Sequence, residues 1–373
     1  MSDGIVLLAT FFGCLLLGVP IAACLGAAAI IVVLASGIPI ALVGQRLVAS
    51  IDSFTLVAVP LFIFAGDIMA SGGIARRLIR LSLALVGWMR GGLAAANVFA
   101  SMIFGGISGS ASADVAAIGP VLIPAMKKDG YGENYACALT AATSTLGIII
   151  PPSIPMVLLS ASTGTSLVGL FLGGYLPGLL IAVSFIVFVV VRAVWLKEGQ
   201  RRSFSLAELG KSLLDGVWAV VAPLIIVGGI VFGICTPTEA SAVGVVYAAI
   251  VSIFVYREIS FKGLFQIAIR SMMTTGVIIL IFGCASLFAY VLTRAQIPQA
   301  IVEAISTITP EIWAQILIIN LFLLVVGMFL DPAAAIITLA PMMMPIADHL
   351  GMDPIHFGLM LIINLAIGLI TPP

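Results

Sequence analysis

The sequence contains few charged residues. Only 9% of its 373 residues are Asp, Glu, Lys or Arg, whereas 62% are hydrophobic, and a typical soluble domain carries about 25% charged residues. This composition excludes a water-soluble globular fold, because such a fold must cover its core with polar surface. With a mean hydropathy of +1.29, most of the chain must be surrounded by lipid. Each span needs about 20 apolar residues, so there is room for about ten crossings.

Residues that bind transition metals or form disulfides are also scarce. There are two histidines and five cysteines, and no two cysteines form a CxxC pair. Neither a metal centre nor a disulfide framework is therefore expected. The formal net charge is zero, which excludes a nucleic-acid-binding surface as the main feature. The sequence lacks a GxxxxGK[ST] phosphate loop, so direct use of ATP is not expected.

The N-terminus has no Lys or Arg before its first apolar run and carries only Asp3 there. It therefore lacks the basic region of a cleavable signal peptide, and the first helix is expected to remain as a span.

The basic residues that are present indicate the cytoplasmic side of the membrane. Two groups flank the apolar run 216–256, which is long enough for two helices that cross out and back. Both groups can then lie on the cytoplasmic side, and Thr236–Glu239 is expected at the opposite end of the pair. The groups are Arg192, Lys197, Arg201, Arg202 and Lys211 before the run, and Arg257, Lys262 and Arg270 after it.

The chain contains an internal repeat. A shift of 221 residues (327 − 106 = 221) superposes glycines and prolines without a gap over a long stretch of sequence. The matching pairs are Gly106 and Gly327, Pro120 and Pro341, Pro124 and Pro345, Gly130 and Gly351, Gly147 and Gly368, Pro151 and Pro372, and Pro152 and Pro373.

The two copies differ in charge. The first copy contains several Arg and Lys residues between Arg76 and Lys128, whereas no Lys or Arg follows Arg294 in the second. Matched segments with opposite basic content should face opposite sides of the membrane, and inverted repeats are typical of secondary transporters. A duplicated scaffold that transports nothing is the alternative, but it would leave the helix breaks described below unexplained. We predict an all-α polytopic membrane protein with inverted-topology repeats: residues 1–195, a basic cytoplasmic linker 196–215, and residues 216–373.

Each copy contains a short segment rich in small residues or proline. These segments, 108–126 and 328–347, predict two re-entrant helical hairpins. Each copy also has a Pro-Pro pair that breaks a helix, at 147–152 in the first copy and at the last two residues in the second. We expect the second copy to be truncated there, with further ligands beyond Pro373. A broken helix at membrane depth is tolerated where its free backbone groups line a cavity or bind a ligand.

Oxygen-bearing residues surround both breaks. Hydroxyl, amide and carboxylate oxygens beside freed carbonyl groups are the donors that an alkali cation requires, and Na⁺ is the only metal ion that they suggest. For any single Ser or Thr, packing between helices is the alternative. The candidate cation ligands are Ser108, Gly109, Ser110, Ser112, Ser144, Thr145 and Gly147 in the first copy, and Gly327, Asp331, Asn364, Gly368 and Thr371 in the second.

A second group of residues is predicted to line the path of the solute. Acidic residues inside a membrane are costly and are usually functional. For Asp67 and Glu239, an interfacial position or a contact with a partner subunit is the alternative to a place in the solute path or a proton relay. The candidates are Asp114, Thr143, Pro151, Pro152, Asp67 and Glu239.

Four motifs together resemble the large membrane subunit of tripartite ATP-independent periplasmic (TRAP) transporters. They are Cys235-Thr-Pro-Thr-Glu-Ala240, the serine- and glycine-rich segment Gly105–Asp114, Pro120-x-x-x-Pro124, and Gly147-Ile-Ile-Ile-Pro-Pro152. The resemblance extends from the region of Leu17 to the last residue. The second Pro-Pro motif departs from the pattern because it is incomplete.

The resemblance implies an elevator-type, Na⁺-coupled symporter in a bacterial inner membrane. It implies a small four-helix membrane subunit and a periplasmic binding protein that delivers an organic acid, such as a C4-dicarboxylate or a sialic acid. By position, the family's hairpin-tip and broken-helix residues fall on 108–112, 143–147 and Pro151-Pro152, and on Gly327, Asp331, Asn364, Gly368 and Thr371.

Two alternatives to transport by a carrier are an intramembrane enzyme and a channel. An intramembrane hydrolase would need a Ser–His pair or paired acids at depth, but His349 and His356 flank a Gly-Met-Asp-Pro turn, so we expect no enzyme and no organic cofactor. A channel, or an ion-coupled carrier without a binding protein, remains an alternative because channels also use re-entrant hairpins.

Overall fold

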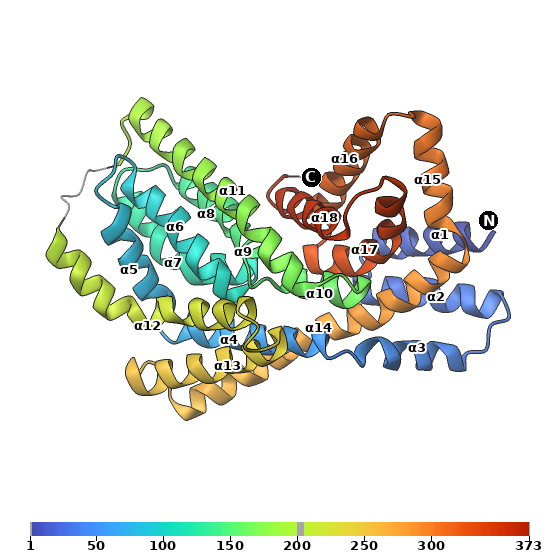
Figure 1. The fold of residues 1–373 in the computed structure, drawn as a ribbon, viewed down its shortest axis with the longest axis horizontal. Coiled ribbons are helices and arrows are strands. Elements are labelled where there is room, and N and C mark those ends of the chain that lie inside the picture. The colour runs from blue at the N-terminus through green and yellow to red at the C-terminus, as the bar shows by residue number, and fades with distance from the viewer. Residues whose placement is uncertain (1, 200–204, 373) are drawn as a thin grey trace. The chain divides into compact units, whose positions relative to one another are not determined.

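The computed structural model describes residues 2–199 and 205–372, and over these residues it consists of helices and connecting loops without a β-strand (Figure 1). The predicted all-α fold is therefore confirmed. Arg201 and Arg202 of the predicted linker, and Pro373 of the second Pro-Pro pair, lie outside the described residues.

In this part of the chain, five helices are long and apolar enough to cross a membrane, or up to seven if each of two bent helix pairs is one span. The five are α11 (Leu167–Leu196), α12 (Leu206–Val231), α13 (Pro237–Ile250) with its π-helical continuation to Val255, α14 (Phe261–Arg294) and α16 (Ile312–Phe329).

The helices form two compact units. Unit 1 comprises Met1–Leu56, Val157–Ser166 and Met273–Pro373, and unit 2 comprises Val57–Met156 and Leu167–Met272. Each unit contains segments from both halves of the chain. The units are thus distinct from the predicted repeats, whose boundaries remain predictions.

Unit 1 is built around the second copy of the repeat. The chain turns back at Gly18-Val19-Pro20, after its first helix. Helix α14 packs against the N-terminal helices through rings such as Phe11 and Phe288, whose centroids are 5.3 Å apart. Its other helices are α1 (Ser2–Leu16), α2 (Ile21–Ala35), α3 (Ala41–Ile51), α15 (Ile297–Ile308), α16, α17 (Pro332–His349), α18 (Pro354–Leu369), and most of η1 (Thr55–Val57) and of α10 (Ile154–Thr163).

Unit 2 is built around the first copy, and α6 lies at its centre because nearly all of its residues are buried. The predicted out-and-back pair is present as α12 and α13, and the turn between them ends at Thr236, which caps α13. The other elements are α4 (Ala58–Ser71), α5 (Ile74–Val86), α6 (Gly92–Ser108), α7 (Ala111–Lys128), α8 (Glu133–Ser144), α9 (Leu146–Ile149), α11, η2 (Val251–Val255) and the part of α14 up to Met272.

The sequence repeat is reproduced in the helices. Adding 221 to the bounds of α7, 111 and 128, gives 332 and 349, the bounds of α17. The same shift carries the end of α6 at 108 to the end of α16 at 329, and the start of α8 at 133 to the start of α18 at 354. The two copies therefore fold into the same succession of helices.

Each copy contains a helical hairpin, and in both the hairpin is longer than the segment singled out in the sequence. In the first, α6 and α7 are joined through Gly109 and Ser110; in the second, α16 and α17 are joined through Leu330 and Asp331. The predicted segments 108–126 and 328–347 consist mainly of the second arms. The preceding helices supply the first arms, which apolar composition alone does not distinguish from ordinary spans.

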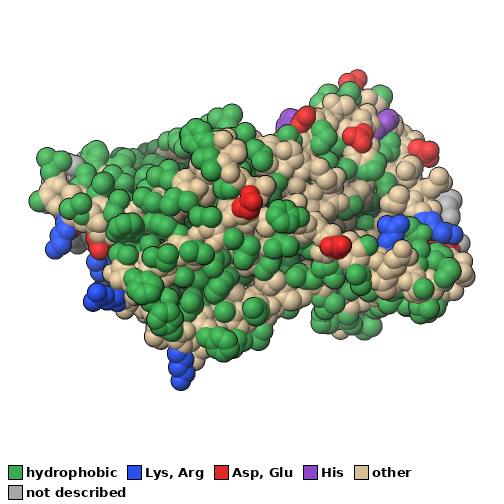
Figure 2. Space-filling model, turned by 60° about the horizontal axis from the view of Figure 1, so that its bottom comes forward, with side chains coloured by type: hydrophobic (Ala, Val, Ile, Leu, Met, Phe, Trp, Pro, Cys, Tyr) green, Lys and Arg blue, Asp and Glu red, His purple; other side chains and the backbone are tan. Residues whose placement is uncertain are grey.

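Apolar side chains cover much of the surface. Figure 2 shows a face on which hydrophobic side chains predominate and charged side chains are few. Helix α11 exposes Leu176, Leu180 and Phe188 among others. Such a surface is stable in contact with lipid, where every backbone polar group must be satisfied within the helices.

One charged cluster in unit 2 joins α5, α12 and the segment after α13. The Arg77 guanidinium donates to Glu258 at 2.7 Å and to Asp215 at 3.2 Å, and lies 3.6 Å from the centre of the Tyr256 ring. Burial opposes the charged form of Arg77, but these two acids outweigh it and raise the pKa of the side chain. Gly73, with a φ of +77°, packs against Glu258 where a Cβ atom would lie 2.3 Å from the carboxylate.

We expect Arg77→Gln to lower the free energy of unfolding of the purified protein by about 1.5–3 kcal/mol, because it leaves two acids without their shared donor. The midpoint of thermal unfolding in detergent measures this. Arg90→Gln is the matched control, because Arg90 is exposed in the turn between α5 and α6. Equal midpoints for the two variants would show that the cluster does not hold these segments together.

Candidate functional site

The tip of the first hairpin is a tight turn that the local sequence dictates. Helix α6 ends at Ser108, Gly109 follows with a φ of +63° that favours glycine, and Ser110 is extended. The Ser110 hydroxyl accepts from the Ala113 N–H at 3.5 Å and thereby caps α7, and it lies 3.0 Å from the Ser112 hydroxyl. The tip therefore places hydroxyl groups at the positive end of a helix dipole.

The break in the first copy lies between α9 and α10. The Pro151-Pro152 pair lies at this break, and the helix restarts at Ile154. The Ser153 hydroxyl donates to the Ile148 carbonyl, which lost its helical partner when the helix ended. Every residue from 143 to 160 is buried. The break is thus enclosed by protein, as a non-helical segment at membrane depth must be.

The tip and the break touch each other inside unit 2. The Ile154 N–H donates to the Gly109 carbonyl at 3.2 Å. Helices α6 and α9 meet at Gly105 and Gly147, where a Cβ atom on Gly105 would lie 2.5 Å from the Gly147 Cα. A Cβ atom on Gly109 would lie 3.1 Å from the Pro152 carbonyl oxygen. Only glycine permits this approach of two backbones.

Three predicted hydroxyl ligands lie buried at this contact. Ser144 and Thr145 each donate to a carbonyl of their own helix at 2.7 Å, and Ser108 donates to the Ser110 carbonyl at 3.4 Å. Each side chain is at most 4% exposed. Because each hydroxyl uses its hydrogen in these bonds, its oxygen lone pairs are available to a cation.

A buried polar network lies between α6 and α8. Asn97 donates to the Thr140 hydroxyl at 2.7 Å, and the Thr143 hydroxyl lies 3.2 Å from both Asn97 and Ser101. From the sequence we predict a functional position for Thr143 but none for Asn97, Ser101 and Thr140. The signal was available, since Asn97 and Ser101 are four residues apart in an apolar helix and therefore share one face.

Asp114 projects from α7 toward this network and is completely buried. Neither of its carboxylate oxygens makes a hydrogen bond to a described residue, although Ser101 is close enough to influence the group. A buried carboxylate without a partner is very costly, so this position requires a proton or a cation.

The second copy repeats the backbone contact within unit 1. A Cβ atom on Gly327 would lie 3.0 Å from the Gly368 Cα. Asp331 occupies the position of Ser110 (331 − 110 = 221) and accepts from the Ala333 N–H at 2.9 Å, so it caps α17 as Ser110 caps α7. Asn364 donates to Asn320 across α18 and α16 at 2.6 Å.

Two differences separate the copies. Thr371 is exposed and donates to the Ile367 carbonyl at 2.9 Å, so it lies apart from the buried contact. The positions equivalent to Ser101 and Asp114 are Phe322 and Ala335 (322 − 101 = 221; 335 − 114 = 221). The second copy therefore carries its acid at the hairpin tip, whereas the first carries it on the helix behind the tip.

Asp67 and Glu239 have partners outside the contact of tip and break. Asp67 on α4 accepts from the Ser271 hydroxyl at 2.6 Å. Glu239 is exposed and accepts from the N–H and the hydroxyl of Thr236, both at 2.8 Å, which completes a capping box on α13. Helix capping thus gives Glu239 a structural role, for which the spacing Thr-x-x-Glu is a typical sequence signature.

The donors at the two breaks are hydroxyl, amide, carboxylate and backbone carbonyl oxygens. Within residues 2–199 and 205–372, no three His, Cys, Asp or Glu side chains gather into a metal-binding group. Hard oxygen donors suit alkali and alkaline-earth cations rather than transition metals. The residues at the first break therefore fit the predicted Na⁺.

The sequence was compared with known proteins. Residues 8–373 match the family Tripartite ATP-independent periplasmic transporter, DctM component. One relative is the C4-dicarboxylate TRAP transporter large permease protein DctM of Pseudomonas aeruginosa, which is 42% identical over 88% of this chain and 77% of that one. Another is the 2,3-diketo-L-gulonate TRAP transporter large permease protein YiaN of Escherichia coli, which is 37% identical over 97% of this chain and 87% of that one.

A solved structure with a similar fold is the YdaH transporter of Alcanivorax borkumensis. Its TM-score is 0.52 at 13% identity, covering 86% of this chain and 75% of that one, and this likeness concerns the fold alone. The match to the family over nearly the whole length decides the identity of the chain. It is a multi-pass membrane protein that belongs to the DctM component family of tripartite ATP-independent periplasmic transporters.

Proposed function

We propose that the chain is the large permease subunit of a Na⁺-coupled importer of an organic acid in a bacterial inner membrane. The acid is a C4-dicarboxylate, a sialic acid or a similar carboxylate, delivered by a periplasmic binding protein. A small four-helix membrane subunit completes the transporter. The observation that carries the proposal is the buried contact between the first hairpin tip and the Pro-Pro break, together with membership in the family.

In this proposal Na⁺ binds where tip and break meet in each copy. Ser108, Ser144 and Thr145 offer buried hydroxyl oxygens in the first copy, and Asp114 supplies the nearby negative charge. Gly327, Asp331, Asn364 and Gly368 take the corresponding positions in the second. A cation that contacts both a hairpin tip and a helix break favours the conformation in which the two are together, and this links ion binding to closure of the site.

The carboxylate of the solute requires positive potential and hydrogen-bond donors. Helix α7 begins at the tip with Ser110 and Ser112, and the N-terminal end of a helix favours an anion. The Pro152 carbonyl approaches Gly109 at this point, and we place Pro152 along the solute path together with Thr143 and Pro151. Transporters of this general kind bind solute and ion at broken helices near the middle of the membrane.

The movement that we propose is of the elevator type. The tip and the break of the first copy are joined by Gly105, Gly147 and the bond from Ile154 to Gly109 within one compact unit. Such a tightly packed element moves as a rigid piece, because close-packed contacts do not deform continuously.

Uptake into proteoliposomes tests the function. Permease, small subunit and candidate binding proteins are reconstituted, and radiolabelled succinate and sialic acid are supplied. We expect saturable uptake that requires an inward Na⁺ gradient and a binding protein. Uptake that proceeds equally well without Na⁺ would contradict the coupling, and uptake without any binding protein would favour an ordinary carrier or a channel.

Asp114→Asn tests the buried carboxylate. The side chain keeps its shape but loses its charge, so we expect the Na⁺ concentration for half-maximal uptake to rise at least about tenfold, equivalent to roughly 1.4 kcal/mol. Asp348→Asn is the matched control, because Asp348 is exposed at the end of α17. An unchanged Na⁺ dependence in folded Asp114→Asn would remove this residue from the cation site.

A further inference from the structure

The charged cluster around Arg77 in unit 2 lies where apolar helices end. Asp215 is the last charged residue of α12, and every residue from 216 to the end of that helix at Val231 is uncharged. Glu258 stands just after the apolar run 216–256. Because Arg77 donates to both acids, the two ends of the run lie at one level. This level corresponds to the border between hydrocarbon and headgroups, on the side that the basic residues predict to be cytoplasmic.

Three arginines of α5 share the two acids. Guanidinium nitrogens of Arg77 and Arg76 lie 2.7 Å and 3.8 Å from oxygens of Glu258. Those of Arg77 and Arg80 lie 3.2 Å and 3.5 Å from oxygens of Asp215. One guanidinium charge therefore has no acid of its own in the cluster. The side chains of Arg76 and Arg80 are 61% and 62% exposed, so each fork of N–H donors can bind an anion in addition to its acid.

The neighbouring charged residues do not remove this surplus of positive charge. Lys211 and Glu208, earlier on α12, cancel each other, and Arg257, directly before Glu258, adds a further positive charge. The cluster and its neighbours in the chain therefore carry a net positive charge.

Arg76 and Arg80 are one helical turn apart on α5. Residues at this spacing lie on one face of a helix, and two like charges there destabilise it. Arg76 also stands in the first turn of α5, which contains no acidic residue and where the helix dipole adds positive potential. An anion bound between the two guanidinium groups would relieve both effects. A phosphate group suits this place, because guanidinium forks bind phosphate oxygens in pairs.

An exposed apolar stripe on α12 begins beside the cluster. Helix α5 packs against α12, and Leu214, directly before Asp215, is 78% exposed. Val217, Trp218 and Leu224 are also exposed, and their spacing of three, four and seven residues places them on the same face. From Leu214 to Leu224 the helix rises about 15 Å. This is about half of the hydrocarbon core, the depth that one leaflet of acyl chains occupies.

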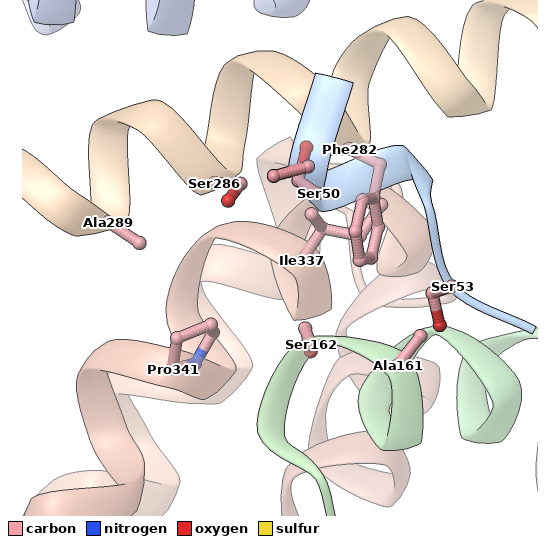
Figure 3. A pocket seen from close by; sticks show the side chains of 10 residues that line it. Ser50, Ser53, Ala161, Ser162, Phe282, Ser286, Ala289, Ile337 and Pro341 are labelled. Carbon is pink, nitrogen blue, oxygen red and sulfur yellow. The ribbon is translucent and has the colours of Figure 1, made fainter. Parts of the chain in front are cut away.

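A hollow of about 260 Å³ in unit 1 offers a different environment (Figure 3). Its described lining contains four serines and no charged residue. The hydroxyl groups offer hydrogen bonds, but nothing in this lining compensates the charge of a phosphate. The two arginines beside a lipid-facing stripe are therefore the better match for an anionic headgroup.

We propose that Arg76 and Arg80 bind the phosphate of an anionic phospholipid in the cytoplasmic leaflet, with an acyl chain along the exposed face of α12. The headgroup supplies the third negative charge of the cluster. Phosphatidylglycerol fits because it carries a net negative charge, whereas the choline cation of phosphatidylcholine cancels its phosphate. Binding of the lipid is independent of the proposed transport of an organic acid.

Quenching of tryptophan fluorescence by brominated lipids tests the proposal. The chain has four tryptophans, and replacement of Trp88, Trp195 and Trp313 by phenylalanine leaves Trp218, on the stripe, as the reporter. The purified permease is placed in phosphatidylcholine nanodiscs that contain a small fraction of brominated phosphatidylglycerol or of brominated phosphatidylcholine. We expect phosphatidylglycerol to quench more strongly, with a relative affinity about fivefold or more in its favour, the effect of a basic residue at an anionic headgroup.

The double variant Arg76→Gln/Arg80→Gln should lose this preference, because both headgroup ligands lose their charge. Arg46→Gln/Arg294→Gln is the matched control, since both of these arginines are exposed, belong to unit 1 and remove the same charge; it should keep the preference. Arg76→Lys/Arg80→Lys should keep part of it, because the charge remains while the paired donors are lost.

Equal quenching by the two lipids in the protein with all its arginines would overturn the proposal, and this comparison needs no folded variant. Survival of the preference in Arg76→Gln/Arg80→Gln would overturn it as well. An equal loss in the control would do the same, because it would show attraction to the overall charge of the protein rather than binding at this site.

Discussion

The close approach of two glycine backbones is the constraint on which the candidate site depends. A helix broken inside a membrane must have its free backbone groups covered by protein, since no water is available to hydrogen-bond them. In the first copy α6 meets the break at Gly105 and Gly147, and the Ile154 N–H, the first of the restarted helix, finds its acceptor in Gly109. Any side chain at the crossing would separate the helices and expose the break. The second copy uses Gly327 and Gly368 for the same purpose.

The two copies share this backbone arrangement but differ in the polar side chains at equivalent positions. The capping position is Ser110 in one and Asp331 in the other, and both accept from the N-terminal turn of the following helix. The first copy adds a buried network around Asn97 and Thr143 with Asp114 beside it, and the second has Phe322 and Ala335 at the positions of Ser101 and Asp114. Duplication thus preserved the backbone geometry while the distribution of negative charge diverged.

The few charged residues of this chain have identifiable roles, because an unpaired charge is costly in an apolar environment. Arg77 joins three segments of unit 2 through Asp215, Glu258 and Tyr256, and Glu239 caps α13. The Arg46 guanidinium is held 4.3 Å from the centre of the Tyr290 ring. The uncharged hydroxyl groups supply most of the remaining polar surface in the interior. An interior of this kind supplies hydrogen-bonding oxygens without the cost of burying many fixed charges.

The sequence alone determined the membrane environment, the helical class, the repeat with its offset, the turn at Thr236 and the helix break at Pro151-Pro152. These follow from local properties: apolar length, proline geometry and the spacing of glycines. The tertiary structure decided which side chains meet. It showed that the first arms of the hairpins are the preceding helices, that Asn97, Ser101 and Thr140 belong to the polar network, and that Arg77 links α5 to Asp215 and Glu258. Such contacts join residues far apart in the chain, and their distances depend on packing that no local pattern encodes.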